Sequence, residues 1–438
     1  MTIQWILKLF RDPVHGFIEL GDAEVQIVDT PLFQRLRRIR QLGFSHLVYH
    51  GAEHSRFGHS LGALHIADRV LSTLIDTPSY TCDDRQREDL QNARNVIRMA
   101  ALLHDIGHTP FSHSLEFVCS SDGTETSHED YSAIIVENYN QIASVLEDKL
   151  CVSPRKVGAL IRGIGPPLQK DIIVGYLGVD RIDYLLRDSY YCGVKYGIFD
   201  YHRILATLRV AKMRKNEETV ETIAVDREKG IHALEEYVLS RYWMYQQVYH
   251  HKTKCCFEAM IEYIFNNYKM AQEKLGYPSC DEVSSNPELL LKYDDHHFLK
   301  ILKEISNEIP LANNILFRKP YKVVFDSIKI EREKQAEIFK ELGIMEKENR
   351  LAPRNVDPHK VLKKEVQLQI IDEEQGFIPI AEKINGYWEL QDASNYSIII
   401  RQLIESLGNT CRIYIFADPS IADEVQRYIK RELGIESY

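Results

Sequence analysis

The sequence predicts a mainly α-helical fold with a smaller α+β subdomain at its C-terminal end. Up to about residue 311, long segments carry apolar residues at helical spacing. Beyond residue 312 the chain alternates or runs apolar as strands do, at 322–325, 366–371 and 412–416. Helical segments lie between and after these, at 329–342, 395–407 and 419–434. We therefore expect three parts: an N-terminal segment with the first helix at 1–50, a helical core at 51–311 and the α+β subdomain at 312–438.

Composition and charge narrow the class of protein. The chain has 438 residues, of which 44% are hydrophobic and 27% charged, an ordinary balance for a globular protein with a large core. Its formal net charge of −10 argues against bulk electrostatic binding to nucleic acid or to an anionic membrane. The eight cysteines include no C-x-x-C pair, and no apolar run approaches the length of a membrane span. We expect a cytoplasmic protein with reduced thiols and no membrane partner.

The first helix is expected to begin at Pro31. Asp29-Thr30-Pro31 places a capping residue before a proline, which is favourable in the first helical turn. Apolar residues follow at helical spacing, and four arginines crowd the polar faces: Arg35, Arg37, Arg38 and Arg40. A solvated surface would explain these arginines, and so would a site that binds an anion.

The most informative stretch is a helix that ends in His104-Asp105. Residues 99–103 are Met, Ala and Leu, which favour helix, and Gly107 and Pro110 supply stop signals about one turn later. Imidazole and carboxylate are both ligands of divalent metals. Because neighbours on a helix diverge by about 100°, two ligands here leave a site incomplete. The candidates to complete it are His54, His59, His108, His113, His128, Asp180 and Asp183.

Four further segments frame this helix. Residues 79–92 are hydrophilic and are expected to form a linker. Residues 119–127 are expected to form a flexible loop that leads into a helix starting at His128-Glu129. Residues 178–188 place polar residues on one helical face at three- and four-residue spacing. Residues 231–270 are predicted to form one long helix dense in aromatic residues.

Seven motifs occur in order along the chain: Asp12-Pro13-Val14-His15-Gly16, Asp29-Thr30-Pro31-x-Phe33-Gln34-Arg35-Leu36, Gln41-Leu42-Gly43, His54-Ser55-Arg56-Phe57-x-His59-Ser60-Leu61-Gly62, His104-Asp105-x-Gly107-His108-x-Pro110-Phe111-Ser112-His113, Asp180-x-x-Asp183-Tyr184-x-x-Arg187-Asp188 and Tyr249-x-His251-Lys252. This series resembles the deoxynucleoside triphosphate triphosphohydrolases (dNTPases) of the HD superfamily. Within them it looks most like the bacterial enzymes and the catalytic core of the vertebrate SAM- and HD-domain dNTPase. The resemblance covers about residues 8–270 well, and it implies that the core is an HD-domain helical core.

The resemblance implies a metal-dependent active site. The family's metal ligands match His59, His104, Asp105 and Asp180. Two imidazoles and two carboxylates suit a divalent metal such as Mg, Mn, Fe or Zn, without selecting one of them.

The resemblance also implies the groups that would carry protons. The family's active-site histidines match His108 and His128, and Glu116 and Glu129 match carboxylates that orient them. A histidine placed to protonate the leaving 5′ oxygen matches His113. Imidazole is the natural group for proton transfer near neutral pH.

The same resemblance implies how a dNTP would be bound. Positions that grip the phosphates match Arg56, Arg181, Arg241 and Lys252. The vertebrate branch has Lys where this chain has Arg181, which keeps the charge and adds a guanidinium fork. Readers of the 3′-hydroxyl match Gln41, Leu42, Tyr184 and Asp188. Tyr249 matches the aromatic residue that crowds the 2′ position of the sugar and so rejects ribonucleotides.

Regulation is the last implication of the resemblance. The vertebrate enzyme and some bacterial relatives are tetramers switched on by guanine nucleotides between subunits. The positions that read the first guanine match Asp29, Gln34 and Arg37, and those that hold effector phosphates match Lys8, Arg203, Arg227 and Lys229. Arg11 departs from the vertebrate pattern, in which an Asn contacts a second nucleotide. We expect a homo-oligomer, a dimer or a tetramer, that GTP or dGTP activates.

The expected function is hydrolysis of dNTPs to deoxynucleoside and intact inorganic triphosphate. One alternative is an HD phosphatase or phosphodiesterase that acts on another nucleotide. A second alternative is a nucleotide-sensing homologue without catalytic activity. The set of arginine and lysine residues and Tyr249 argue against the first alternative, and the complete ligand set argues against the second.

Overall fold

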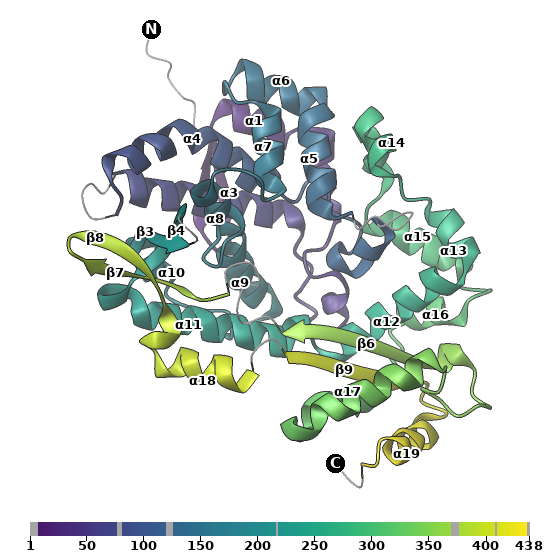
Figure 1. Ribbon diagram of the computed structural model, residues 1–438. Helices are drawn as coiled ribbons and strands as arrows, with labels where there is room; N and C mark the ends of the chain where they lie inside the picture. Colours follow the sequence, from purple (N-terminus) through teal and green to yellow (C-terminus); the bar gives the residue numbers. More distant parts are fainter. Residues whose placement is uncertain are drawn as a thin grey trace. The chain divides into compact units, whose positions relative to one another are not determined.

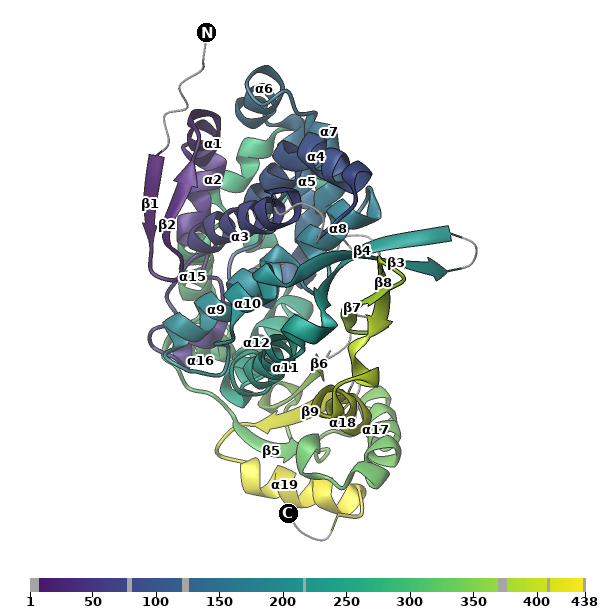
Figure 2. The same ribbon diagram turned by 90° about the vertical axis from the view of Figure 1, so that its left-hand side faces the viewer.

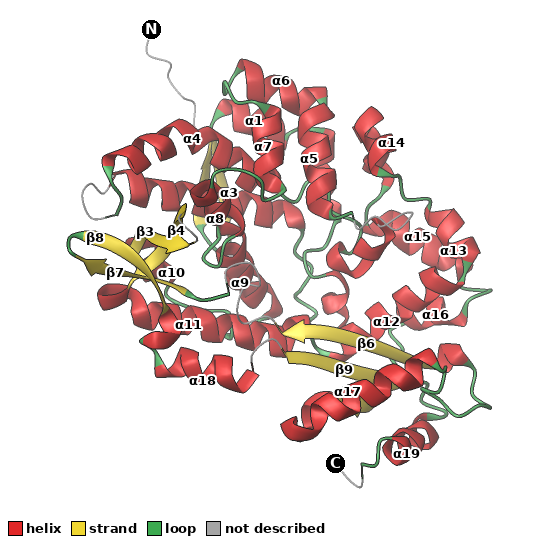
Figure 3. Cartoon of the chain, viewed as in Figure 1, coloured by secondary structure: helices red, strands yellow, loops and turns green. Residues whose placement is uncertain are grey.

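The computed structural model describes residues 8–76, 81–119, 126–215, 218–368, 376–407 and 410–435. These residues are mainly helical (Figure 3), which confirms the predicted fold class. The chain forms two compact units. Unit 1 comprises Met1–Met244, Tyr277–His296 and Gln369–Gly408, and unit 2 comprises Tyr245–Gly276, His297–Leu368 and Asn409–Tyr438. This division does not follow the expected boundaries at residues 50 and 311.

Three helices form the centre of unit 1 (Figure 1). They are α3 (Arg56–Asp76), α4 (Asp84–Leu103) and α9 (Val179–Cys192), and α3 packs against both others. Gly62 permits the close approach of α3 and α9, because a Cβ atom there would lie 1.8 Å from the Asp183 carboxylate. These helices or the residues next to them carry all four predicted metal ligands.

Helix α4 begins earlier than the sequence suggested. Asp83 caps it by accepting the Gln86 N–H at 2.9 Å, and the Gln86 side chain accepts the Asp83 N–H in return. The linker prediction is therefore wrong from residue 84 onward, and residues 77–80 lie outside the described ranges. The many polar residues of this segment form the outer face of a helix whose inner face buries Leu90, Ala93 and Ile97.

The first predicted helix is shorter than expected. It consists of α2 (Pro31–Arg35) and a 3₁₀ turn at Leu36–Arg38, and an unpredicted helix α1 (Asp22–Val28) precedes it. A hairpin of β1 (Lys8–Asp12) and β2 (Gly16–Leu20) comes before α1. The remaining helices of unit 1 up to residue 244 are α5 (His128–Asn138), α6 (Asn140–Asp148), α7 (Pro154–Ile161), α8 (Pro167–Val174), α10 (Tyr201–Ala206) and α11 (Arg227–Met244). Helix α5 starts at His128, as predicted, and Cys119 ends a 3₁₀ segment that begins at Ser112.

The predicted single helix over 231–270 is wrong. Helix α11 ends at Met244, a π-helical turn covers Tyr245–Tyr249, and α12 covers Lys252–Asn267. The His251 ring accepts the Thr253 N–H at 3.2 Å, which caps the start of α12.

Four strands of unit 1 were not predicted. They are β3 (Leu208–Lys215), β4 (Glu218–Asp226), β7 (Pro379–Ile384) and β8 (Tyr387–Asp392), which close a small barrel (Figure 2). Ala211, Ala224, Ala381 and Leu390 fill its interior. Charged residues alternate along β3 and β4, so these strands lack the apolar run that marks the strands of unit 2.

Unit 2 contains strands at the three segments that the sequence predicted, but the strand expected at 366–371 begins at Val361, and residues 369–371 lie outside the described ranges. Its strand order is β5 (Lys322–Asp326), β9 (Thr410–Ala417), β6 (Val361–Leu368), and both pairings are antiparallel. The predicted segments at 329–342 and 419–434 correspond to α17 (Arg332–Lys347) and α19 (Ala422–Glu432), which pack on this sheet. The segment at 395–407 corresponds to α18 (Ile398–Leu407), which belongs to unit 1. The remaining helices between residues 269 and 316 are α13 (Lys269–Leu275), α14 (Cys280–Ser285), α15 (Asp295–Ile305) and α16 (Pro310–Leu316).

None of the helices in the described ranges is long and apolar enough to cross a membrane.

Candidate metal centre

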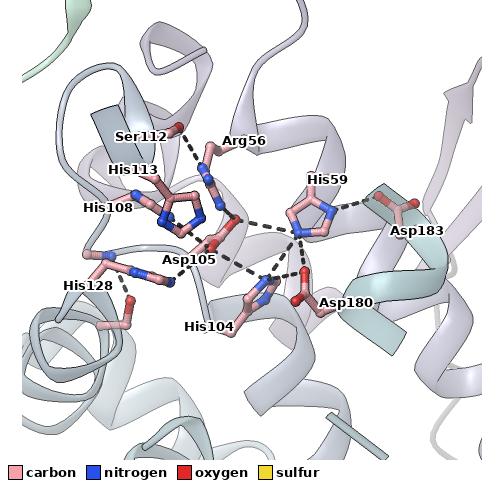
Figure 4. A network of polar contacts seen from close by, with 12 residues as sticks. Arg56, His59, His104, Asp105, His108, Ser112, His113, His128, Asp180 and Asp183 are labelled. Atoms are coloured by element: carbon pink, nitrogen blue, oxygen red, sulfur yellow. Dashed lines mark hydrogen bonds and ion pairs between the residues drawn. The ribbon is translucent and has the colours of Figure 1, made fainter. Parts of the chain in front are cut away.

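The four predicted metal ligands converge in unit 1 (Figure 4). His59 Nε2 lies 3.0 Å from Asp180 Oδ1, 3.2 Å from His104 Nε2 and 3.6 Å from Asp105 Oδ2. His104 Nε2 lies 3.5 Å from Asp105 Oδ1 and 3.6 Å from Asp180 Oδ1. Ligand atoms about 2.1 Å from one ion lie about 3.0 Å apart in an octahedral site and about 3.4 Å apart in a tetrahedral one. His59, His104 and Asp105 each offer one ligand atom within 4.8 Å of the others, and Asp180 lies beside His59 and His104. The donor types fit a divalent cation.

Contacts on the far side of each imidazole orient the two histidine ligands. His59 Nδ1 lies 2.8 Å from Asp183 Oδ2, and His104 Nδ1 lies 2.8 Å from the Ala101 carbonyl oxygen. A carbonyl and an ionised carboxylate only accept hydrogen bonds, so each Nδ1 is the donor. Both histidines therefore turn Nε2 toward the centre, and a bound metal would take the place of the proton on that atom, as it does at metal-binding histidines.

Besides His59, two neighbours hold Asp183. Its carboxylate accepts hydrogen bonds from His15 Nε2 at 2.6 Å and from Arg187 Nε at 2.8 Å. The buried Arg187 guanidinium also donates to Asp12 Oδ2 at 2.8 Å. Asp183, which the sequence offered as a candidate ligand, thus lies behind His59 and supports it. The Asp12–Gly16 motif gains a physical role here, because two of its side chains lock that support.

The electrostatics of the centre favour a bound cation. Burial alone would lower the pKa of His59, but Asp180, Asp183 and Asp105 raise it to about 10. Burial opposes the ionisation of Asp105, but the Arg56 guanidinium beside it holds the pKa of that carboxyl well below its usual range. Three carboxylates thus surround one imidazole, and positive charge is stabilised where the four ligand atoms meet.

The five predicted catalytic residues form a second cluster next to the first. The rings of His108 and His128 stack with their centroids 3.9 Å apart, and His113 stands edge-on to both. Glu116 joins two of the histidines, because Oε1 accepts from His128 Nδ1 at 2.5 Å and Oε2 accepts from His113 Nδ1 at 2.7 Å. Glu129 Oε2 lies 3.3 Å from His128 Nδ1.

Asp105 connects the two clusters. Its Oδ1 atom lies 3.7 Å from His108 Nε2 and 3.9 Å from His128 Nε2. Among the described residues, neither ring nitrogen of the buried His108 has a hydrogen-bond partner. Burial and the nearby Arg56 lower the pKa of His108 well below its usual value, so this imidazole is neutral. Glu116 raises the pKa of His128 against the effect of burial, so this imidazole carries a proton more readily.

Seven of the nine predicted substrate-binding residues lie in unit 1, and two lie in unit 2. In unit 1, Arg56 contacts Asp105, and Asp188 Oδ1 contacts His54 Nε2 at 2.8 Å. The His54 carbonyl accepts the Gln41 N–H at 3.0 Å, with Leu42 next in the chain. Arg181 and Tyr184 are half-buried on α9, and Arg241 is buried on α11. Tyr249 and Lys252 belong to unit 2, and their part in the site stays a prediction.

The predicted effector residues lie in unit 1 at several places. Gln34 Oε1 accepts from Arg37 Nε at 2.8 Å, and Asp29 is exposed at the end of α1. Arg203 Nε donates to the Lys229 carbonyl oxygen at 2.8 Å. Arg227 pairs with Glu382, and Lys8 is the exposed first residue of β1.

The structure separates the four arginines of the first helical segment. Arg35 is fully buried, Arg38 pairs with Asp294, and Arg40 pairs with Glu53 and Asp295. Arg37 is exposed, and its guanidinium lies 3.5 Å from the centre of the Phe57 ring. It lines a cavity of about 470 Å³ together with Phe10, Arg11, His54 and Tyr191. Of the four arginines, Arg37 is therefore the candidate to bind an anion, and the other three contact groups of the same chain.

The residues that sequence reasoning missed are supporting ones. His15 and Arg187 stood in the quoted motifs, yet spacing gave no sign that both contact Asp183. Asp295 lies outside every motif, and its contacts to Phe111 and Arg40 span more than 180 positions of sequence. Only the folded chain shows these partners.

Family models match the chain over most of its length. A model of the HD domain matches residues 56–188, and a model of the HD associated region matches residues 199–438.

Curated relatives include proteins with and without an assigned activity. An uncharacterized protein, YwfO of Bacillus subtilis, is 39% identical over 273 residues, which are 62% of this chain and 58% of that protein. Deoxynucleoside triphosphate triphosphohydrolase SAMHD1 of Danio rerio is 28% identical over 382 residues, which cover 77% of this chain and 59% of that protein. The chain thus spans less than two thirds of the length of these relatives.

Solved structures match almost the whole chain. A hypothetical protein from Aquifex aeolicus superposes with a TM-score of 0.73 at 27% identity, covering 97% of this chain and 100% of that one. A phosphohydrolase from Bacteroides thetaiotaomicron superposes with a TM-score of 0.68 at 26% identity, covering 94% of this chain and 99% of that one.

Proposed function

Because the chain belongs to the HD-domain phosphohydrolase family, we propose that it is a metal-dependent dNTP triphosphohydrolase. It would convert a dNTP and water into a deoxynucleoside and inorganic triphosphate. The observation that carries the proposal is the group of His59, His104 and Asp105 beside a cluster of three histidines, with Asp105 between the two clusters. The relatives named SAMHD1 support dNTPs as the substrate class.

His59, His104, Asp105 and Asp180 would hold the divalent cation. When bound, such a cation polarises a phosphate oxygen and lowers the pKa of a water ligand. In the hydrolysis the oxygen of water bonds to the α-phosphorus, and the bond between that phosphorus and the 5′ oxygen breaks.

The chain's own residues would manage the protons of this reaction. His108 is neutral and buried with both ring nitrogens unpartnered among the described residues, so it is suited to accept a hydrogen bond from the attacking water. His113 keeps 63% of its side chain exposed, and Glu116 orients its ring. It would give its proton to the 5′ oxygen of the departing deoxynucleoside. His128, paired with Glu116, would balance the negative charge that grows on the phosphate.

Residues spaced along helix α9 would contact successive parts of the substrate, from the α-phosphate to the sugar. Tyr184 and Asp188 follow Asp180 by four and eight residues, which is about 6 and 12 Å at about 1.5 Å per residue. That length spans the distance from an α-phosphate to the far side of a deoxyribose. Gln41, Leu42, Tyr184 and Asp188 would read the 3′-hydroxyl, and Tyr249 would exclude a 2′-hydroxyl. The positive charge of Arg56, Arg181, Arg241 and Lys252 would bind the triphosphate.

Activation by GTP or dGTP is the regulatory part of the proposal. It is supported by the cavity beside Arg37, which combines a guanidinium with the aromatic rings of Phe10, Phe57 and Tyr191. Asp29, Gln34 and Arg37 would read guanine, and Lys8, Arg203, Arg227 and Lys229 would hold phosphates. The chain would assemble as a homo-oligomer in which a nucleotide joins neighbouring subunits.

One experiment separates this function from its alternatives. The protein is incubated with each of the four dNTPs, with and without divalent metal and with and without GTP, and the products are separated by ion-exchange chromatography. The proposal predicts deoxynucleoside and triphosphate in equal amounts, only when metal is present. Hydrolysis of a nucleoside monophosphate or of a cyclic nucleotide in a parallel panel would favour another HD phosphohydrolase. Nucleotide binding without any product would favour a sensor.

A further inference from the structure

Two consecutive residues of the HD motif have left-handed backbone conformations. Phe111 has φ 55° and Ser112 has φ 56°, and neither is a glycine. A residue with a side chain is less stable in this conformation than in a right-handed one, because its Cβ atom approaches the backbone. They directly precede His113 in the chain. A pair of unfavourable residues at this place requires contacts that hold it there.

Asp295 provides one of these contacts, and it is buried. Its side chain is 1% exposed, and its Oδ1 atom accepts the Phe111 N–H at 2.7 Å. Its Oδ2 atom accepts the Arg40 N–H at 3.1 Å and lies 3.2 Å from the Arg40 guanidinium. One carboxylate therefore fixes both the turn at Phe111 and the segment that carries Arg40. Asp295 lies in unit 1, as Phe111 and Arg40 do.

The turn in its fixed form reaches the candidate metal centre through Ser112. The Ser112 hydroxyl donates to the Arg40 carbonyl oxygen at 2.6 Å and accepts from Arg56 Nε at 2.9 Å. Arg56 then donates to Asp105 Oδ2 at 2.6 Å (Figure 4). A continuous series of contacts runs from Asp295 through Arg40 and Ser112 to Arg56 and the ligand Asp105.

A second buried contact ties the same chain segment to the loop after His104. The fully buried Arg35 donates to the Tyr293 carbonyl oxygen at 2.9 Å. It also donates to the carbonyl oxygens of Ile106 at 3.2 Å and His108 at 2.5 Å. Residues 293–295 and the 104–113 loop are thus joined at both ends of the loop, by Arg35 and by Asp295.

We propose that Asp295 is a positioning residue of the active site: it holds the left-handed turn at Phe111-Ser112, so that Ser112 and Arg56 fix Asp105 and His113 faces Glu116 and His128. This inference rests on the proposed function, since it concerns the same reaction. Asp295 touches no reacting atom. Its effect is on the placement of the groups that do, and a misplacement of about 1 Å can cost about 100-fold in rate.

Asp295→Asn tests the proposal with little change in shape. An amide has one donor end and one acceptor end, so in either orientation its NH₂ group meets the Phe111 N–H or the Arg40 donors. Asp294→Asn is the matched control, because the neighbouring Asp294 accepts from Arg38, whose side chain is 41% exposed. We expect kcat for a dNTP to fall about 10- to 100-fold in Asp295→Asn, with KM within about 3-fold and metal content equal to wild type. Asp294→Asn should keep kcat within about 2-fold.

Hydrogen–deuterium exchange adds a readout that does not depend on activity. In the metal-loaded protein, the Phe111 amide should exchange at least about 10-fold faster in Asp295→Asn than in wild type or in Asp294→Asn. If wild type hydrolyses no dNTP, the proposed function fails, and this exchange result still decides whether Asp295 holds the turn. Unchanged exchange at Phe111, or a kcat equal to that of Asp294→Asn, would overturn the proposal.

Ser112→Ala keeps the test decisive if Asp295→Asn does not fold. It removes the hydroxyl that joins the turn to Arg56 and leaves Asp295 and the Phe111 N–H in place. We expect kcat to fall about 10-fold or more, with metal content and Phe111 exchange as in wild type. A wild-type kcat in Ser112→Ala would break the series of contacts on which the proposal depends.

Discussion

The candidate metal centre and the predicted effector cluster (Lys8, Asp29, Gln34, Arg37, Arg203, Arg227 and Lys229) lie in the same unit but are built differently. Each histidine of the metal centre has a second hydrogen bond that fixes its ring, and His59 is fully buried. The effector cluster is mostly exposed, and its members come from separate segments. The four predicted metal ligands all come from unit 1 of one chain. The effector cluster would need a ligand or another subunit to bring its parts together.

Loss of a metal ligand should have the largest effect. Asp180→Ala or His104→Ala leaves three ligands, which hold and orient a divalent ion poorly. We expect turnover to fall by about 10³-fold or more and bound metal to be lost, while circular dichroism shows a folded protein. Metal content measured by elemental analysis beside kcat checks this. Near-normal hydrolysis by either variant would show that these residues are not the metal ligands. Arg37→Ala is the control, and it should keep its metal.

The anchor at Asp295 should make stability depend on pH. Burial raises the pKa of Asp295 to about 6. The folded state therefore binds this proton more tightly than the unfolded chain, in which the pKa is about 4. The resulting stability is fully present below about pH 4 and is lost as the pH rises through 6. Wild type should thus lose up to about 3 kcal/mol relative to Asp295→Asn across this window. Urea unfolding of both proteins at pH 4, 5, 6 and 7 measures it, and parallel profiles would contradict it.

Substitution of Asp183, which supports the predicted ligand His59, should reduce metal binding less than loss of a ligand does. Asp183→Asn keeps the size of the side chain but weakens the acceptor for His59 Nδ1 and its pairing with Arg187. We expect a loss of about 10- to 100-fold in metal affinity, the range found for such supporting contacts. Competition with a metal-binding dye measures the affinity. Asp68→Asn is the control, because Asp68 lies on α3 with His59 and pairs with Arg94. It should leave the affinity unchanged, and an equal loss in both variants would mean a general effect on unit 1 instead of a loss of the contact to His59.

The smallest effect is expected at the effector cluster. Arg37→Ala should keep basal turnover and metal but lose stimulation by GTP or dGTP, a change of about 5-fold or more. Arg38→Ala is the control, because Arg38 already pairs with Asp294 inside the chain. Turnover and light-scattering mass are measured with and without nucleotide. If wild type responds to neither nucleotide in rate or in mass, the cavity beside Arg37 is not a regulatory site.

The sequence predicted best what short motifs determine. The family resemblance implied His59, His104, Asp105 and Asp180 as ligands. The structure brings four pairs of their atoms within 3.6 Å, and their role as ligands stays a prediction. The start of α5 at His128 and the strands of unit 2 follow from capping and from apolar runs. Such features depend on near neighbours, which a single sequence contains.

The features that sequence reasoning missed depend on distant partners. Arg35 and Arg37 are two residues apart on one segment, yet one is fully buried against carbonyl oxygens and the other is exposed. Spacing alone does not separate them, because the partners of Arg35 lie at Ile106, His108 and Tyr293. Strands β3 and β4 were missed for a similar reason. Charged residues alternate along them, and they also pair with β8 and β7, which lie far away in the sequence. The turn at Phe111-Ser112 likewise depends on Asp295.

The central claim is that this site breaks the bond between the α-phosphorus and the 5′ oxygen by attack of water on phosphorus. Hydrolysis of a dNTP in oxygen-18-labelled water, with mass spectrometry of both products, tests it directly. We expect one labelled oxygen in inorganic triphosphate and none in the deoxynucleoside. Release of orthophosphate or pyrophosphate, or label in the deoxynucleoside, would contradict it.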